Sequence, residues 1–166
     1  MGSAVAKWFD SLGWKPNPFQ REAWKAFAAG GDGLVQAPTG MGKTFAALGG
    51  VVDEACREDE NSKGLQVIWI APIRALSKEI EASARRMLEG VGLDWQVGIR
   101  TGDTTAAERA RQRRRLPEVL ITTPESLHLL FCTADHPQHF ASCRLLVVDE
   151  WHALLGSKRG VQVELA

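Results

Sequence analysis

Short apolar runs alternate with longer amphipathic stretches along the whole chain. Most runs are bounded by glycine, proline or charged residues, which is the pattern of strands that end in turns. The runs are almost continuously apolar, and this is typical of parallel strands that are buried on both faces. They predict strands at 33–37, 66–71, 95–100, 118–123 and 144–150.

The stretches between these runs show helical spacing. In 77–89, for example, Ile80, Ala84 and Leu88 fall on one face of a helix. The pattern predicts helices at 42–54, 77–89, 105–115 and 126–131, and two short helices within 7–29 that flank the Pro-Asn-Pro sequence at 16–18. Strands that alternate with helices predict an α/β fold, in which a parallel sheet carries helices on both faces.

Composition narrows the class of protein without deciding it. The chain has 166 residues and a formal net charge of +0, so any binding to nucleic acid must come from local placement of charge. Three cysteines, Cys56, Cys132 and Cys143, fit a reducing compartment better than a disulfide framework. No apolar stretch is long enough to span a bilayer, and the first residues lack the pattern of a signal peptide. We therefore expect a cytoplasmic protein without membrane contacts.

The sequence APTGMGKT, at 37–44, is the strongest chemical signal. It lies between a predicted strand and a predicted helix, where Gly40 and Gly42 let the backbone turn its N–H groups toward an anion. The helix N-terminus adds partial positive charge. Lys43 can reach the β- and γ-phosphates of a nucleotide, and the Thr44 hydroxyl can ligate Mg²⁺. The loop residues expected to bind the nucleotide are Thr39, Gly40, Met41, Gly42, Lys43 and Thr44.

A pair of carboxylates follows the last predicted strand. Asp149 and Glu150 come directly after the apolar sequence LLVV. Ligands of open α/β sheets bind at the carboxyl ends of the strands. There Asp149 would hold Mg²⁺, and Glu150 would orient or deprotonate the water that attacks the γ-phosphate. Taken alone, the pair also fits a strand that ends in solvated acids. With the phosphate loop, it predicts ATP and Mg²⁺ as cofactors and Lys43, Asp149 and Glu150 as catalytic residues.

Five motifs, in the same order, resemble those of superfamily 2 helicases. They are APTGMGKT at 37–44, APIRAL at 71–76, RTGDT at 100–104, TTPESL at 122–127 and DEWH at 149–152. DEWH resembles the DExH form of motif II, and Ala37 replaces a glycine of the general phosphate-loop pattern, as is common in this superfamily. The sequences around the last three motifs are most similar to the Lhr group, and within it to the shorter, DNA-ligase-associated bacterial members.

The resemblance implies a RecA-like P-loop NTPase lobe, the first of two lobes in a motor, that stops after motif II. Residues 1–32 would form N-terminal helices with a Q-like motif, and residues 33–166 an incomplete ATP-binding lobe. In related motors the strand of motif III lies between the strands of motifs I and II. We therefore expect a gap in the sheet and poor stability for the 166-residue chain.

In this family the nucleic acid lies across the tops of two lobes and is held mainly by its backbone. The resemblance assigns this contact to three segments, each just after a predicted strand. Their residues are Pro72, Arg74, Thr101, Gly102, Asp103, Thr123, Pro124, Glu125 and Ser126. A guanidinium offers a fork for a phosphate, and hydroxyls give contacts that do not depend on base sequence. For any one segment alone, an ordinary strand-end turn is the alternative.

Two further residues have open alternatives. Gln20 occupies the place of a Q-type motif in related helicases, where its amide would pair with adenine, and a capping or surface glutamine is the alternative. His152 links the ATP site to motif III in the DExH family, and a hydrogen-bonded structural histidine is the alternative.

Two clusters favour plainer interpretations. The arginine-rich sequence at 109–116 would spread its charges around a helix, which favours a solvated surface, with a phosphate or partner contact as the alternative. The ligand types in Cys132, His136, His139 and Cys143 suit zinc. Polar linker histidines and half-buried cysteines explain this cluster equally well, and helicases of this kind need no metal there.

The function expected from these patterns is that of an ATP-dependent DNA helicase or translocase, although the isolated chain should hydrolyse ATP hardly at all. The resemblance implies single-stranded DNA or an RNA–DNA hybrid as partner, DNA-ligase-associated repair proteins as further partners, and a role in DNA repair. The alternatives are an RNA helicase and a non-motor nucleic-acid-binding module with a P-loop fold. The intact Lys43, Thr44, Asp149 and Glu150 favour the motor over the module.

Overall fold

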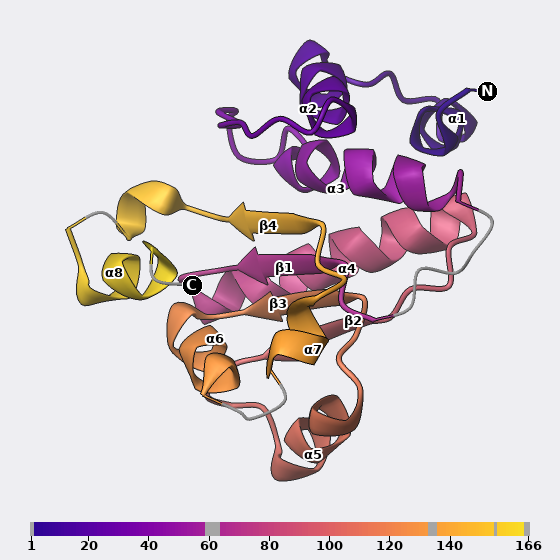
Figure 1. Cartoon of the computed structure of the whole chain (residues 1–166). Coiled ribbons are helices and arrows are strands. Elements are labelled where there is room, and N and C mark those ends of the chain that lie inside the picture. Colours follow the sequence, from indigo (N-terminus) through magenta and orange to yellow (C-terminus); the bar gives the residue numbers. More distant parts are fainter. Residues whose placement is uncertain (1, 59–63, 133–135, 155, 165–166) are drawn as a thin grey trace. The chain divides into compact units, whose positions relative to one another are not determined.

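A computed structural model describes residues 2–58, 64–132, 136–154 and 156–164 (Figure 1). The chain divides into two compact units. Unit 1 comprises Met1–Ser62 and Ala82–Asp94, and unit 2 comprises Lys63–Glu81 and Trp95–Ala166. None of the helices in the described residues has the length and apolar character that a membrane crossing requires.

The described part of unit 1 is helical. It contains α1 (Ala4–Ser11), α2 (Pro18–Ala28), α3 (Lys43–Ala55) and the second part of α4 (Arg74–Val91). Local signals start these helices: the Ser3 hydroxyl accepts a hydrogen bond from the Ala6 amide, and Asn17 with Pro18 begins α2. The two short helices expected within 7–29 are therefore confirmed as α1 and α2, although α1 begins before that range, at Ala4.

Aromatic side chains form the core of unit 1. Rings of α1, α2 and α3 and of the segment between α1 and α2 meet mostly edge to face, which is a favoured geometry for aromatic pairs. The cluster consists of Trp8, Phe9, Trp14, Trp24 and Phe45. Its tryptophans are thus packing residues.

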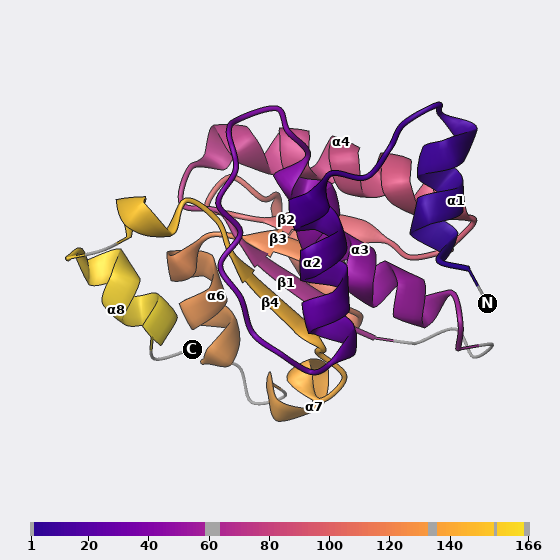
Figure 2. The same ribbon diagram turned by 90° about the horizontal axis from the view of Figure 1, so that it is seen from above.

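Trp24 seats α2 against α3, as Figure 2 shows for the two helices. Its indole lies directly on the backbone of α3 at Gly49, where any added Cβ would collide with Trp24 Nε1. The same nitrogen donates to the Phe45 carbonyl oxygen at 3.0 Å. Gly49 is therefore required by a close approach of two helices.

Unit 2 is built on a four-stranded parallel sheet. The strands are β1 (Val67–Ile70), β2 (Val97–Arg100), β3 (Val119–Thr122) and β4 (Leu145–Val148), in the order β2-β3-β1-β4. Ile70 is in register with both Thr122 and Val148, and Arg100 is in register with Thr122. All four strands therefore end at the same edge of the sheet.

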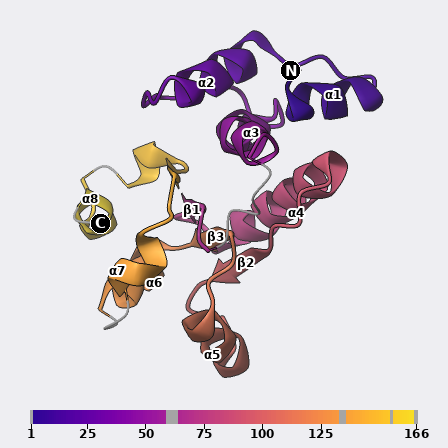
Figure 3. The ribbon, with the colours of Figure 1, turned by 45° about the vertical axis from the view of Figure 1, so that its right-hand side comes forward.

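Short helices follow the strands of unit 2. They are the first part of α4, α5 (Ala106–Arg114), α6 (Pro124–Phe131), α7 (His136–Phe140), the 3-10 helix η1 (Trp151–Ala153) and α8 (Lys158–Glu164). Figure 3 shows α6 and α7 on one face of the sheet and α5 beyond β2. Leucine, isoleucine and valine side chains of β1, β3, α6 and α8 form one buried cluster there: Ile68, Ile70, Leu120, Leu127, Leu130 and Val163, together with Leu65, Leu116 and Leu154.

The predicted α/β fold with a parallel sheet is confirmed, and four of the five predicted strands form within two residues of the expected bounds. The strand predicted at 33–37 is wrong. Residues 31–38 have no regular secondary structure, and Leu34 is 83% exposed. A strand is stable only beside a hydrogen-bonded neighbour. The described part of unit 1 offers no such neighbour, so the apolar run stays irregular.

We expect the 166-residue chain to unfold with a midpoint below about 55 °C. β4 is an edge strand, and its Leu146 is half-exposed, whereas β1 and β3 are buried throughout. Apolar surface left in water at Leu34 and Leu146 contributes nothing to folding. Circular dichroism during heating measures the midpoint. A single cooperative transition above that temperature would contradict the expectation.

Gly49→Ala should lower the free energy of unfolding by about 1–3 kcal/mol, because the new methyl group displaces Trp24. A loss of stability would be informative, because replacing a glycine within a helix by alanine normally raises the free energy of unfolding. Urea unfolding of the chain gives the measurement. Gly33→Ala is the matched control, because no atom lies within 4 Å of a Cβ added there. Equal stability of the two variants would contradict the proposed packing.

Candidate nucleotide and nucleic-acid site

The predicted phosphate loop, 37–44, leads directly into α3. Gly40 and Gly42 have φ angles of 80° and 82°, in the left-handed region that favours glycine. Gly42 is the N-cap of α3, so Lys43 and Thr44 are the first two residues of the helix. A Cβ at Gly42 would also lie 2.7 Å from Gln20 Nε2. Backbone conformation and close contact both require glycine at position 42.

Side chains at the start of α2 hold this loop. Gln20 Nε2 donates to the Gly42 carbonyl oxygen at 3.1 Å, and Asn17 Nδ2 donates to the Met41 carbonyl oxygen at 3.4 Å. The other end of the Gln20 amide, Oε1, accepts from the Asn17 amide at 2.8 Å. The loop backbone is thus fixed before any anion arrives, which is the condition for pre-organised binding.

Gln20 is a capping residue in this structure, as one of its two interpretations predicted. It is 2% exposed, and its amide joins the N-cap of α2 to the phosphate loop. A contact between Gln20 and adenine stays a prediction. The nucleotide contacts of Thr39, Gly40, Met41, Lys43 and Thr44 are likewise predictions, now with the loop geometry described.

In unit 2, Asp149 follows β4 and is oriented by two donors. Its backbone amide continues the ladder to the Ile70 carbonyl oxygen at 2.9 Å. Asp149 Oδ2 accepts from Trp69 Nε1 at 3.3 Å, and Oδ1 accepts from the Glu150 amide at 2.9 Å. A carboxylate has about four lone-pair sites. Both oxygens therefore retain acceptor capacity, which fits the expected Mg²⁺ role.

Glu150 has φ 47°, and it is the only non-glycine residue with positive φ in the described part of the chain. Such a conformation is uncommon for a side-chain-bearing residue, and it ends β4 with a sharp change of direction. Glu150 Oε2 lies 3.3 Å from His152 Nε2, whose side chain is largely exposed. The close contact matches the structural alternative for His152, and a link to motif III stays a prediction.

The structure brings together the three segments predicted to bind nucleic acid, because β1, β2 and β3 end in register. Of the nine candidate residues in these segments, four are exposed: Arg74, Gly102, Asp103 and Glu125. The other five candidates are buried: Pro72, Thr101, Thr123, Pro124 and Ser126. The hydroxyl of Thr123 donates to Ser126 Oγ at 3.1 Å and caps α6. Hydroxyl contacts to phosphate are therefore less accessible here than the charged groups.

Both exposed acids in these segments are paired with arginines. Arg74 Nη1 donates to both carboxylate oxygens of Asp103 at 2.9 Å. Glu125 accepts from Arg159, a residue of α8. Burial works to raise the pKa of Glu125, but the hydrogen bonds from Arg159, from its own amide and from Thr123, together with the Arg159 charge, hold that pKa below its ordinary value.

Three residues near these sites were missed as functional candidates. Trp69 holds Asp149, and Arg159 holds Glu125. Arg109 donates through Nε to the Thr104 carbonyl oxygen at 2.9 Å, and its Nη2 donates to the carbonyl oxygens of the preceding loop residues, 101 and 102. The solvated surface favoured for the arginine-rich helix is thus wrong for Arg109, which clamps the loop. The only signal in the sequence was the position of Arg109, a few residues after the TGD motif at 101–103.

Arg100, at the end of β2, is a buried cation. It is 8% exposed, and its Nη1 has no hydrogen-bond acceptor among the described residues. Burial, followed by the nearby charges of Arg109 and Arg113, lowers its pKa. The strand end beside the TGD loop is therefore locally positive although the chain as a whole is neutral.

The candidate zinc cluster is only partly within the described residues, because the side chain of His136 lies outside them. In the described part of the chain, no group of three or more histidine, cysteine, aspartate or glutamate side chains could hold a metal ion. Burial raises the pKa of the Cys143 thiol, whose Sγ donates to the Leu145 carbonyl oxygen at 3.6 Å. A thiol in that state is a poor metal ligand.

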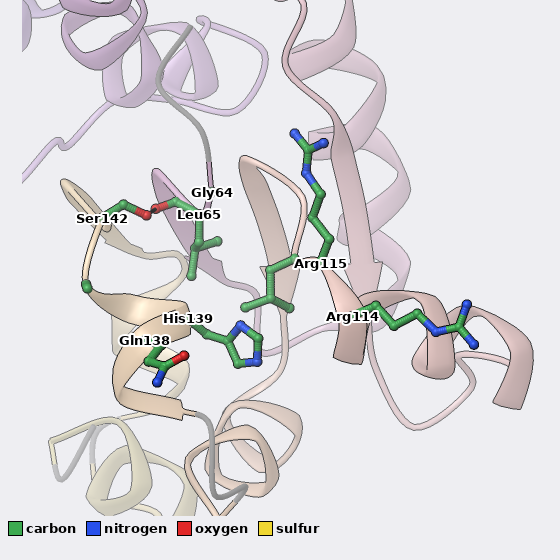
Figure 4. A pocket seen from close by; sticks show the side chains of 9 residues that line it. Gly64, Leu65, Arg114, Arg115, Gln138, His139 and Ser142 are labelled. Atoms are coloured by element: carbon green, nitrogen blue, oxygen red, sulfur yellow. Dashed lines mark hydrogen bonds between the residues drawn. The ribbon is translucent and has the colours of Figure 1, made fainter.

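A pocket of about 440 Å³ lies at the opposite edge of the sheet, where the strands begin. Figure 4 shows the side chains of Arg114 and Arg115 extending away from Leu65 and His139, so the polar groups do not converge. Its lining residues are Gly64, Leu65, Arg114, Arg115, Leu116, Gln138, His139, Ala141 and Ser142. The residues of unit 2 predicted to bind nucleotide or nucleic acid are instead at the edge where the strands end.

The pattern of DEAD/DEAH box helicases matches residues 17–166. The chain belongs to the DEAD/DEAH box helicase family. It is 39% identical to a Lhr helicase and probable uracil glycosylase of Mycolicibacterium smegmatis, over 96% of this chain and 11% of that protein. It is 35% identical to a Lhr helicase/uracil glycosylase of Escherichia coli, over 98% of this chain and 12% of that protein. The predicted similarity to the Lhr group is thereby confirmed.

The fold agrees with a solved structure of Mycobacterium smegmatis helicase Lhr bound to ssDNA and AMP-PNP. The TM-score is 0.88 at 35% identity, and the match covers 99% of this chain and 22% of that one. The RecA-like helicase lobe predicted from the motifs is therefore confirmed. The chain spans only a small part of the relatives it matches, about a tenth of the first two.

Gln20→Met should lower the free energy of unfolding by about 1–3 kcal/mol, because it leaves the Gly42 carbonyl and the Asn17 amide without their partner. Methionine keeps the length of the side chain, so the loss reports the hydrogen bonds. Urea unfolding measures the difference. Gln36→Met, at an exposed glutamine, is the control and should match wild type. A Gln20 variant as stable as the control would contradict this role.

Proposed function

We propose that this chain is the ATP-binding lobe of an ATP-dependent DNA helicase or translocase that moves on single-stranded nucleic acid. The observation that carries the proposal is the strand register of unit 2. That register places the Asp149-Glu150 carboxylates and all three loops proposed to bind nucleic acid at one edge of the sheet. A change at the carboxylates during hydrolysis can thus reach the strand-binding loops over a short distance.

The residues proposed to bind and hydrolyse the nucleotide follow from the motifs and are considered for each unit by itself. The phosphate loop of unit 1 would bind the triphosphate through its backbone N–H groups and the Lys43 ammonium. In unit 2, Glu150 would take a proton from the attacking water, and Trp69 keeps Asp149 oriented. Mg²⁺, held by Thr44 and Asp149, would neutralise charge on the phosphates when bound.

For the partner, we favour single-stranded DNA. The solved Lhr helicase with 35% identity was bound to ssDNA and AMP-PNP, and the Lhr-type motifs run through the whole chain. Among the nine candidate residues at the sheet edge, the exposed ones are three charged residues and a glycine, and charged side chains suit contact with a phosphate backbone of any sequence. RNA or an RNA–DNA hybrid is the alternative. A role in DNA repair, ligase-associated partners and a cytoplasmic location extend the proposal by family resemblance.

An ATPase assay on the full-length parent protein tests the motor. We expect single-stranded DNA to stimulate hydrolysis, with RNA and buffer alone as comparisons. Lys43→Ala should lower the stimulated rate by at least about 100-fold, since the loop loses its charge on the phosphates. Lys78→Ala, at an exposed lysine of α4, is the control. If neither single-stranded DNA nor RNA raised the ATP hydrolysis rate of the wild type, the motor hypothesis would be contradicted.

Glu150→Gln separates binding from chemistry in the same protein. The amide cannot accept a proton, so the rate should fall by about 100-fold or more. ATP affinity should not fall by more than about threefold, because glutamine keeps the shape of the side chain and removes a negative charge that would repel the phosphates. Fluorescent nucleotide titration and steady-state rates give the two quantities. Glu89→Gln, at an exposed site of α4, is the control. If Glu150→Gln hydrolysed ATP at the wild-type rate, another residue would have to act as the general base.

A further inference from the structure

Arg159 joins three segments that are distant in sequence. It belongs to α8, and its Nε donates to Glu125 Oε1 at 2.5 Å. Its Nη2 donates to Glu125 Oε2 at 3.4 Å and to the Pro72 carbonyl oxygen at 2.8 Å. One guanidinium therefore ties the loop after β1 to the start of α6 after β3. Only a planar fork of donors can make all of these contacts at once.

The helix that carries Arg159 is itself held in place. Ser157 Oγ donates to the Leu154 carbonyl oxygen at 2.7 Å and accepts from the Gly160 amide at 3.2 Å. Gly160 lies so close to Leu154 that an added Cβ would collide with the Leu154 carbonyl oxygen. Leu154 is fully buried, and Val163 lies in the same cluster as Leu127 and Leu130 of α6. The two helices that carry Arg159 and Glu125 thus share one core.

The position of Glu125 in the proposed nucleic-acid site calls for a positively charged partner. Glu125 is an exposed carboxylate in the first turn of α6, in a segment proposed to meet a phosphate backbone, where a free negative charge would repel the strand. The pairing with Arg159 neutralises it and fixes its direction. Both side chains are partly exposed, at 39% and 49%, so the pair contributes little to stability. The effect of this ion pair should therefore appear in how the segments after β1 and β3 are placed relative to each other.

We propose that Arg159 is a positioning residue, which holds the loops after β1 and β3 in the arrangement that binds the nucleic-acid strand. This inference rests on the proposed function of the sheet edge. In sequence, α8 begins six residues after the end of the DEWH motif, 149–152, so Arg159 lies close along the chain to the proposed ATP-site carboxylates. Without Arg159 the loops remain folded and lose their common alignment.

The test uses the full-length parent protein and its strand-stimulated ATPase activity. Arg159→Ala should raise the single-stranded DNA concentration for half-maximal stimulation by about tenfold, with kcat at saturating DNA within about twofold of wild type. Arg159→Lys keeps the charge but cannot bridge both loops, so it should resemble Arg159→Ala. When Glu125 is already replaced by alanine, adding Arg159→Ala should change the DNA concentration for half-maximal stimulation by less than about twofold, because the partner of Arg159 is already lost.

Arg111→Ala is the matched control. Arg111 also pairs with a glutamate, Glu108, at 2.8 Å, but both residues lie within α5, so the pair joins no separate segments. It should behave as wild type. Thermal unfolding of each variant should be unchanged, which separates positioning from loss of fold. If Arg159→Ala matches the Arg111 control, if Arg159→Lys restores wild-type behaviour, or if the Glu125 and Arg159 effects add, the inference is overturned. A wild type without strand stimulation refutes the proposed function instead.

Discussion

The parallel hydrogen-bond ladder of unit 2 is the constraint on which its site depends. Because Arg100, Ile70 and Val148 end their strands in one register line with Thr122, everything that follows a strand emerges at one edge. Motif residues separated by dozens of positions become neighbours by this means alone. A slip of one residue in any strand would turn its side chains to the other face and displace the loop that follows.

The loops at that edge are held by side chains rather than by regular structure. Arg109 clamps the carbonyl groups of the TGD loop, Arg74 holds Asp103, and Arg159 bridges two loops. The arginines thus satisfy backbone carbonyls and neutralise acids before any phosphate is present. In a chain with a net charge of +0, these arginines are thus used to hold the segments that follow the strands.

In unit 1, the phosphate loop is likewise held by side chains rather than by regular structure. Its glycines allow the left-handed turns, but Asn17 and Gln20 of α2 fix the backbone that those turns create. Trp24 then seats α2 on α3, whose first residues are Lys43 and Thr44. The N-terminal helix α2 therefore supports the phosphate loop through Asn17 and Gln20, and it packs on α3 through Trp24.

The sequence alone determined the fold class, four strands, most of the helices and the family, because apolar runs and motif spacing are local properties. It failed at 33–37, where the apolar run GLVQA lacks a neighbouring strand within its own unit, and pairing is a tertiary property. Only the tertiary structure decided that Thr123 and Ser126 are buried and that Trp69, Arg109 and Arg159 orient the site. Their partners are distant in sequence or are backbone carbonyls, which leave no residue-type signal in the chain.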